Sequence, residues 1–315
     1  MKRKGNLYKN ICKVENIIST FDEVCRNTKN KKKVNRYKKL KCVNVRIIYD
    51  TLINRKYVVG PYLHFSIYEP KKRDVVSQEM FDKVINHLVA RYILMPALEK
   101  GLIDANVASR KRGGTSLGLK YFNRYNGICE RKYGRYYILK CDVKSFFASI
   151  NHDILKDKLK RRIKDKDALK IVFDIIDSEE KGLGIGNMTS QILAIFYLDD
   201  LDKYIKEVLK IKYYVRYQDD FLLWHSSKEY LKFCLEKIRG FLEKEKLTLN
   251  NKTRIFTNKE NFIYLGRDRF NRYAKRRLVR RRIKRSKFLY ENNEIELMSF
   301  VSCVRNYRHL VDSKM

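Results

Sequence analysis

Proline and long apolar runs are scarce in this sequence. Only three prolines occur among 315 residues, and no Gly/Ser-rich stretch separates parts of different composition. The pattern therefore predicts one compact unit with lobes rather than independent domains on linkers. No run of about 18 apolar residues occurs, and the N-terminus carries no apolar signal core. We therefore expect a cytoplasmic protein without a membrane partner.

Cysteine and histidine occur in patterns that suit neither a metal site nor a disulfide framework. The seven cysteines are an odd number without a CxxC pair, and no two of the five histidines have metal-ligand spacing. We predict reduced thiols, with neither structural zinc nor disulfides. The cysteines are Cys12, Cys25, Cys42, Cys129, Cys141, Cys234 and Cys303.

Acidic residues are heavily outnumbered by basic ones. The 36 Asp and Glu stand against 71 Lys and Arg, which gives a net charge of +35. Such an excess is costly to gather on a compact body unless a polyanion neutralises it, and nucleic acid is the natural polyanion. The 22 Tyr and 16 Phe indicate a packed fold beneath this charge. An anionic membrane surface is the alternative partner, but no long basic amphipathic helix with an aromatic face favours it.

Apolar periodicity and turn residues predict a mixture of helices and strands. In 77–98 the apolar residues recur at intervals of three and four, the pattern of an amphipathic helix. The apolar run at 136–141 predicts a strand that ends at Asp142, and Asn151 is a suitable N-cap for the helix after it. The other expected elements are helices over 7–60 with a loop at 31–33, a strand over 62–68, helices over 154–163 and 189–209, strands over 213–217 and 221–224, strand and turn over 248–269, and a basic helix over 274–290.

Three acidic residues lie where predicted strands end. Asp142 follows one strand, and Asp219 with Asp220 occupies the tip of a hairpin between two apolar strands. Taken alone, the adjacent pair is also compatible with a polar turn. Carboxylates between apolar strands are costly without a partner, and Mg²⁺ prefers such oxygen ligands. Two ions about 3.5 to 4 Å apart can activate a hydroxyl and hold the leaving oxygens of a phosphoryl displacement. The three acids therefore predict a two-metal centre for nucleotidyl transfer.

Two segments around these acids resemble motifs of the reverse transcriptase family. Tyr217-Gln218-Asp219-Asp220 is similar to the YxDD box, and 140–147 (KCDVKSFF) is similar to the first-aspartate motif, in the right order and separation. Further matches extend the resemblance over most of the chain. These are 69–73 (EPKKR) to a fingers motif, 112–115 (RGGT) to the glycine segment before the palm, Lys252 with Thr253 to the lysine behind the active site, and 262–266 (FIYLG) to the primer-grip hairpin.

The resemblance implies an α+β right-hand polymerase fold with an antiparallel palm sheet. It implies a basic helical extension at 1–60, fingers at 61–135 and a palm at 136–257 that carries the aspartates and part of a fingers insertion. A primer-grip hairpin and a short basic helical thumb would occupy 258–315. The partners would be an RNA template, a DNA or RNA primer and deoxynucleoside triphosphates.

The resemblance also assigns roles by position. Asp142, Asp219 and the Val143 carbonyl would hold the metal ion on the triphosphate, and Asp220 would help complete the shell of the second. The ions would be Mg²⁺, with Mn²⁺ as a substitute. The residues implied for the nucleotide are Lys71, Arg73, Phe146, Phe147, Ile185, Gln191 and Lys252. Those implied for template and primer are Tyr217, Gly266, Lys275, Arg276, Arg280 and Arg281.

Several of these roles compete with a structural reading. Phe147 matches the family's steric gate against a 2′-hydroxyl, and because faces alternate, one of Phe146 and Phe147 should be core and the other should face the site. Ile185 stands where a Gln normally bonds the nucleotide, or it only packs a turn. Lys252 is a candidate general acid for pyrophosphate, or a solvated lysine.

Segment 184–191 (GIGNMTSQ) distinguishes between subgroups of the family. An apolar residue at Ile185 followed by GNMTSQ resembles the reverse transcriptases of diversity-generating retroelements, although that subgroup usually has Pro where Gly184 stands. This likeness implies error-prone copying, a template-repeat RNA and a small basic accessory variability protein. The alternatives are an intron-like, CRISPR-associated or antiphage-defence reverse transcriptase, and a non-catalytic RNA-binding protein with a relic palm.

Overall fold

The structure, a computed structural model, describes residues 3–67, 73–110, 113–268 and 276–311. The chain divides into two compact units. The first is Met1–Leu63 with Val76–Asn258, and the second is His64–Val75 with Lys259–Met315. All three acidic candidates for catalysis therefore belong to the first unit.

The first unit combines an antiparallel sheet with many helices. Its helices are α1 (Tyr8–Ile11), α2 (Val14–Asn27), α3 (Lys31–Lys39), α4 (Lys41–Ile53), α5 (Met80–Val89), α6 (Met95–Leu98), α7 (Thr115–Tyr133), α8 (Phe146–Ser149), α9 (His152–Lys160), α10 (Lys166–Asp177), α11 (Met188–Tyr197), α12 (Asp199–Lys203) and α13 (Lys228–Lys244). Its sheet has the strand order β4-β5-β3-β6, with β3 (Tyr137–Asp142), β4 (Tyr213–Tyr217), β5 (Asp220–His225) and β6 (Arg254–Thr257).

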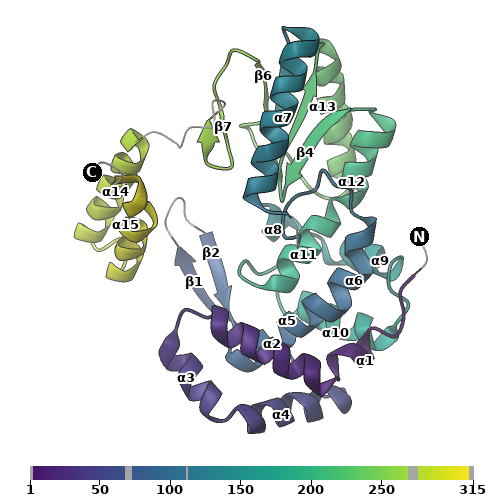
Figure 1. Cartoon of the computed structure of the whole chain (residues 1–315), viewed down its shortest axis with the longest axis vertical. Helices are drawn as coiled ribbons and strands as arrows, with labels where there is room; N and C mark the ends of the chain where they lie inside the picture. The colour runs from purple at the N-terminus through teal and green to yellow at the C-terminus, as the bar shows by residue number, and fades with distance from the viewer. Residues whose placement is uncertain (1–2, 68–72, 111–112, 269–275, 312–315) are drawn as a thin grey trace. The chain divides into compact units, whose positions relative to one another are not determined.

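The two faces of this sheet are covered differently. Along β5, Phe221 and Leu223 join the main core, to which Leu231 and Ile238 of α13 also belong. Trp224, on the other face, packs against α7, where its indole Nε1 donates to Asn126 Oδ1 at 2.8 Å. Helices α7 and α13 both lie along the sheet (Figure 1). The alternation of side chains along a strand therefore builds two apolar layers around one sheet.

The expected hairpin and the expected helix cap are both present. Strands β4 and β5 pair antiparallel with Tyr217 opposite Asp220, so the connecting turn is Gln218-Asp219. The Asn151 side chain accepts from the Ile154 N–H at 3.1 Å and caps α9. The predicted strand before Asp142 is β3, and the described cysteines are free thiols. These features depend on neighbours in the sequence, which explains why the sequence predicts them.

The loop expected at 31–33 is wrong, because these residues form the first turn of α3. Asn30 provides the missing start signal, since its Oδ1 accepts from the Lys33 N–H at 3.1 Å. The rings of Tyr37 and Phe21 stack at 5.1 Å and join α3 to α2. A side-chain cap and one aromatic contact thus hold a helix that the lysine run alone does not favour.

The single helix expected over 189–209 is also wrong, because it is divided into α11, α12 and a π-helical turn at Tyr204–Val208. Two carbonyls near the end of α11 accept hydrogen bonds from distant cations. The Tyr197 carbonyl accepts from Lys158 Nζ at 2.9 Å, and the Ile195 carbonyl accepts from Arg216 Nη2 at 2.9 Å. Such partners compete with the regular helical ladder, and local periodicity cannot reveal them.

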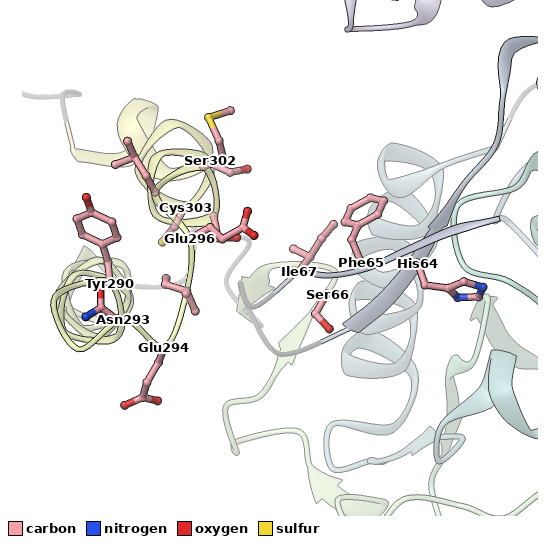
Figure 2. Close-up of a pocket in the computed structure, with 14 residues that line it drawn as sticks. His64, Phe65, Ser66, Ile67, Tyr290, Asn293, Glu294, Glu296, Ser302 and Cys303 are labelled. Carbon is pink, nitrogen blue, oxygen red and sulfur yellow. The ribbon is translucent and has the colours of Figure 1, made fainter.

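The second unit holds most of the hairpin β1 (Leu63–Ile67) and β2 (Arg73–Ser77), the short hairpin β7 (Ile263–Tyr264) and β8 (Arg267–Asp268), and the helices α14 (Arg276–Glu291) and α15 (Leu297–Val311). The rings of Tyr290 and Phe300 stack at 5.5 Å between α14 and α15. A pocket of about 1000 Å³ within this unit is lined by residues of β1, such as Phe65 and Ile67, and by the turn between the two helices (Figure 2). None of the predicted site residues that the structure describes lines this pocket.

Candidate active site

The strand register brings two of the predicted catalytic acids together. Asp142 is the last residue of β3 and Asp220 the first of β5, and they are direct partners in the antiparallel pairing. Asp219 precedes Asp220 in the turn, and its carbonyl accepts from the Val143 N–H at 3.4 Å. The turn contains Gln218 with φ +55°, a conformation that side-chain-bearing residues rarely adopt. Sheet pairing and a tight turn thus place three carboxylates at one end of the sheet.

Lys140 adds a positive charge beside these acids. Residues 140 and 142 share one face of β3, and Lys140 Nζ contacts Asp220 Oδ1 at 2.5 Å. Both side chains are about one-fifth exposed, at 19% and 23%. Burial raises the pKa of the Asp220 carboxyl, the Lys140 ammonium acts against this rise, and the charge of Asp142 adds to it. The site therefore combines three neighbouring acids with one ammonium group that contacts Asp220.

The main chain of Asp142 is anchored by the segment before β6. The Asn250 N–H donates to the Asp142 carbonyl at 2.7 Å, and the Lys144 N–H donates to the Thr248 carbonyl at 2.8 Å. Val143, only 2% exposed, forms an isolated antiparallel bridge with Leu249. Lys252 lies in the following turn, where its N–H donates to Asn250 Oδ1 at 3.1 Å and its side chain is exposed. The turn that carries Lys252 is thus tied to Asp142 through Asn250.

The two adjacent phenylalanines have different surroundings. Phe146 is 2% exposed and belongs to the core, whereas Phe147 is partly exposed and only packs against it. Their rings meet edge to face with centroids 5.8 Å apart. The Phe147 carbonyl accepts from the Leu183 N–H at 2.8 Å, and a Cβ at Gly182 (φ +69°) would lie 2.4 Å from that oxygen. The glycine-rich segment therefore fits closely against the backbone of Phe147.

Gln191 and Tyr217 lie near the Gln218-Asp219 turn, whereas Ile185 contacts β2. The Ile185 carbonyl accepts from the Val76 N–H at 2.8 Å, and its side chain is partly exposed. Gln191 Oε1 accepts from Ser109 Oγ at 3.3 Å, and that hydroxyl accepts from Gln218 Nε2 at 2.9 Å. Tyr217 is partly exposed beside the catalytic turn. A chain of side-chain hydrogen bonds therefore links Gln191 to the turn that carries Asp219.

A family model gives this geometry its context. The model for reverse transcriptase (RNA-dependent DNA polymerase) matches residues 70–268, more than half of the chain. The chain belongs to the reverse transcriptase family. Its members are RNA-directed DNA polymerases.

Individual relatives are distant. Protein YkfC of Escherichia coli (strain K12) is 23% identical over 287 residues, which cover 75% of this chain and 74% of that protein. The structure is similar to truncated apo telomerase from Candida tropicalis, with TM-score 0.54 and 15% identity over 68% of this chain and 53% of that one. Telomerase from Candida albicans, in complex with a TWJ fragment of telomeric RNA, gives TM-score 0.52 and 13% identity over 80% and 54%.

These likenesses show the fold. The chain spans about half the length of the telomerase chains, at 53% and 54%. The predicted α+β right-hand polymerase fold with an antiparallel palm sheet is confirmed. No helix in the described part of the chain is long and apolar enough to cross a membrane.

Reverse transcriptase domains use divalent metal ions, and the donor set here suits a hard cation. Asp142 and Asp220 are direct strand partners at the sheet end, and Asp219 adjoins them. Within the described ranges, however, no three His, Cys, Asp or Glu side chains converge into a metal cluster. One carboxylate oxygen of Asp220 contacts the Lys140 ammonium instead. Asp142 and Asp219 remain the best candidates for metal ligands.

The residues predicted to bind nucleic acid and triphosphate are spread over both units. Arg73 begins β2 and is exposed, and Gly266, with φ +78°, lies in the turn between β7 and β8. Helix α14 begins at Arg276, and its Arg280 and Arg281 are exposed. Lys71 and Lys275 lie outside the described residues.

Four residues of the site are absent from the predicted set, although the sequence carries a partial signal for two of them. Lys140 and Arg216 are charged residues inside otherwise apolar strands, and such residues require a buried partner. Ser109 and Asn250 carry no comparable signal, because their roles depend on loops brought to the catalytic turn by folding. In related sequences, a charged residue inside an otherwise apolar strand is thus the feature to test.

Proposed function

We propose that this reverse transcriptase copies an RNA template into DNA by two-metal nucleotidyl transfer at Asp142, Asp219 and Asp220. The single observation that carries the proposal is the register that sets Asp142 opposite Asp220 beside a tight turn carrying Asp219. A hairpin that were only a polar turn would need no acid on the neighbouring strand. The primer 3′-hydroxyl would attack the α-phosphate of the incoming deoxynucleotide, with pyrophosphate as the leaving group.

The residues of the site divide the work. Asp142, Asp219 and the Val143 carbonyl would hold the ion on the triphosphate, and Asp220 would contribute to the second. When bound, Mg²⁺ or Mn²⁺ lowers the pKa of the attacking hydroxyl and stabilises the leaving oxygens. Phe147, the exposed ring of its pair, would lie under the deoxyribose and exclude a 2′-hydroxyl. Lys252, in the turn tied to Asp142, would protonate pyrophosphate.

The remaining predicted contacts would hold the substrates. Lys71 and Arg73 would bind triphosphate oxygens, for which an arginine gives bidentate geometry. Gly266 and the exposed arginines of α14 would follow the template–primer backbone. Tyr217 would lie beside the primer terminus. The segments 1–60, 61–135, 136–257 and 258–315 would then serve as basic extension, fingers, palm and thumb.

We further propose that the enzyme belongs to a diversity-generating retroelement and copies with frequent errors. The support is Ile185, whose partly exposed side chain lies in the glycine-punctuated segment and cannot donate a hydrogen bond to a nucleotide. The loss of one hydrogen bond costs about 1 kcal/mol. This corresponds to a several-fold loss of selectivity for the correct nucleotide over a mismatched one. The template would be a template-repeat RNA, and a small basic accessory variability protein would assist in the cytoplasm.

Primer extension on an RNA template with Mg²⁺ tests the polymerase. We expect wild type to extend, Asp219→Ala to abolish extension, and the exposed Asp157→Ala on α9 to behave as wild type. Sequencing the products tests the subgroup: errors concentrated at template adenines that fall on Ile185→Gln support it. Accurate copying would instead favour an intron-like, CRISPR-associated or antiphage-defence enzyme. Absent extension, even with accessory protein and cognate RNA, would favour a non-catalytic RNA-binding protein.

A further inference from the structure

Arg216 is a fully buried cation in the strand that leads to the catalytic turn. Its exposure is 0%, and so is that of its partner Asp202 on α12. Arg216 Nε donates to Asp202 Oδ1 at 2.7 Å, and Nη2 donates to Oδ2 at 2.5 Å. The Tyr214 hydroxyl also donates to Asp202 Oδ1, at 2.6 Å. The ion pair is therefore bidentate and fixed in orientation.

The guanidinium uses its remaining donors on main-chain carbonyls. Nη1 donates to the Gln218 carbonyl in the catalytic turn at 2.9 Å, and Nη2 donates to the Ile195 carbonyl at the end of α11 at 2.9 Å. The strand itself is held as well, since the Arg216 N–H donates to the Ala105 carbonyl at 2.8 Å and its carbonyl accepts from the Val107 N–H at 3.0 Å. One side chain thus joins the turn to two helices of the palm.

The turn needs such support because its backbone is strained. Gln218 has φ +55°, a left-handed conformation that persists only when the surroundings impose it. Two hydrogen bonds impose it here, one from Arg216 to the Gln218 carbonyl and one from Gln218 Nε2 to Ser109 Oγ. The next residue is Asp219, so a change at Gln218 would reorient the peptide that leads directly to both turn acids.

Stability alone does not account for the buried ion pair. Removing two charges from water is expensive, and an apolar pair of the same volume often stabilises a core equally well. We propose that Arg216, oriented by Asp202, is a positioning residue that fixes the Gln218 carbonyl and thereby sets Asp219 and Asp220 for catalysis. This inference rests on the proposed polymerase function.

The first test compares two arginines that pair with the same helix, Arg216 at 0% exposure and Arg162 at 17%. Arg162 follows α9 rather than lying in the strand that leads to the turn, and it contacts Asp199 of α12 at 2.9 Å, so Arg162→Lys is the matched control for Arg216→Lys. We expect the single-turnover extension rate of Arg216→Lys to fall by about 10- to 100-fold, as for misplaced catalytic groups. Template–primer affinity should be unchanged. Arg162→Lys should keep the wild-type extension rate even if its Tm falls as much as that of Arg216→Lys. Equal rate losses in the two variants would overturn the proposal.

A second experiment tests whether Arg216 affects the extension rate through the strained turn at Gln218. Glycine adopts positive φ freely, so Gln218→Gly should recover about fivefold of the rate lost in Arg216→Lys. Independent, additive losses would contradict the proposal. If Arg216→Lys does not fold, the neutral pair Arg216→Met with Asp202→Asn replaces it, because the amide still accepts from Tyr214. That variant should fold and lose extension in the same way.

Hydrogen–deuterium exchange in the free protein separates this inference from the proposed function. Exchange at 217–220 should rise in Arg216→Lys and remain at the wild-type level in Arg162→Lys. If wild type shows no Asp219-dependent extension, the polymerase function fails, and exchange still decides whether Arg216 holds the turn. Unchanged exchange in Arg216→Lys would overturn the positioning role whatever the activity of wild type.

Discussion

At the scale of single residues, Phe146 and Phe147 are neighbours in the sequence that differ in burial. Phe146 is 2% exposed within the core, whereas Phe147 is partly exposed. A ring that excludes a 2′-hydroxyl acts by volume, so its removal opens space without changing the chemistry. We expect Phe147→Ala to reduce the discrimination against ribonucleotides by about 1 to 3 kcal/mol. Ribonucleotide incorporation relative to deoxynucleotide incorporation should therefore rise by about 10- to 200-fold.

The measurement is the ratio of kcat/KM for a ribonucleotide and its deoxynucleotide on one RNA template. Phe146→Leu is the control, because it removes volume from the core one residue away. It should lower Tm while leaving the sugar preference intact. A sugar preference that changes in Phe146→Leu and not in Phe147→Ala would assign the gate to the other ring.

The positions of the three acids were predictable because they lie in local sequence motifs at strand ends. Asp142, Asp219 and Asp220 are identified by type, order and strand context, and the structure places them at one sheet end. The contact of Lys140 with Asp220 was not predictable, because it depends on the β3–β5 register that only folding establishes. The anchoring of Asp142 by Asn250 likewise joins residues far apart in the chain.

At the scale of elements, two glycines with open space around them should respond oppositely to a methyl group. Gly240 lies inside α13, and Gly266 lies in the β7–β8 turn with φ +78°. Among the described residues, no atom lies within 4 Å of a Cβ added at either position. Alanine favours a helix interior by about 0.5 to 1 kcal/mol over glycine. At positive φ, alanine costs roughly 1 to 2 kcal/mol.

We therefore expect Gly240→Ala to raise Tm and Gly266→Ala to lower it, measured by thermal unfolding of the full chain. The unfolding followed for Gly266→Ala is that of the second unit, so a local probe near Tyr264 complements the global signal. Steric clash is excluded for both positions, which leaves backbone preference as the cause. Shifts of the same sign would show that the turn or the helix tolerates a different backbone geometry.

Helix α14 should bind nucleic acid through its arginines. Val279 and Ser286 are its buried residues, whereas Arg280 and Arg281 are exposed. Each phosphate contact contributes about 0.7 to 0.9 to the slope of log K against log salt. We expect Arg280→Ala and Arg281→Ala each to reduce the slope for template–primer binding by roughly that amount.

Lys287→Ala is the matched control on the same helix, because Lys287 Nζ lies 3.5 Å from Glu291 Oε1 and that charge is already partly balanced. Binding titrations at several salt concentrations should show a smaller change in slope for this variant. An unchanged slope for both arginine variants would remove α14 from the nucleic-acid interface.

The elements themselves were predictable to different degrees. The β4–β5 hairpin and the Asn151 cap arise from adjacent residues, and both were expected. The start of α3 at Lys31 was missed because its cap, Asn30, stands before a run of like charges. The division of the helix after Tyr197 was missed because Lys158 and Arg216 bind its carbonyls from distant elements.

At the scale of the whole molecule, charge was easier to predict than the division into units. The composition alone gives the excess of basic side chains. The second unit joins His64–Val75 to Lys259–Met315, and no Gly/Ser-rich stretch marks any of the three junctions. Such a grouping depends on contacts between segments about 200 residues apart in sequence, which composition and periodicity do not encode.

The same charge predicts how the free protein responds to polyanions. The chain has a net charge of +35, so its basic side chains repel one another. A polyanion that binds the folded state stabilises that state by mass action. We expect heparin at low ionic strength to raise Tm by about 5 °C or more. A ligand at a free concentration of about 100 times its Kd stabilises the folded state by about 2.7 kcal/mol. The shift should shrink in about 0.5 M NaCl as screening increases.

Asp219→Ala and neutral dextran distinguish the causes of this shift. The variant should show the same rise as wild type, because the effect depends on surface charge and not on the catalytic acids. Dextran of similar size should produce little rise, which excludes crowding, an effect of about 0.2 to 1 kcal/mol. A fall in Tm with heparin would mean that the polyanion binds the unfolded chain more strongly than the folded one, and the basic side chains would then not form a preorganised surface for nucleic acid.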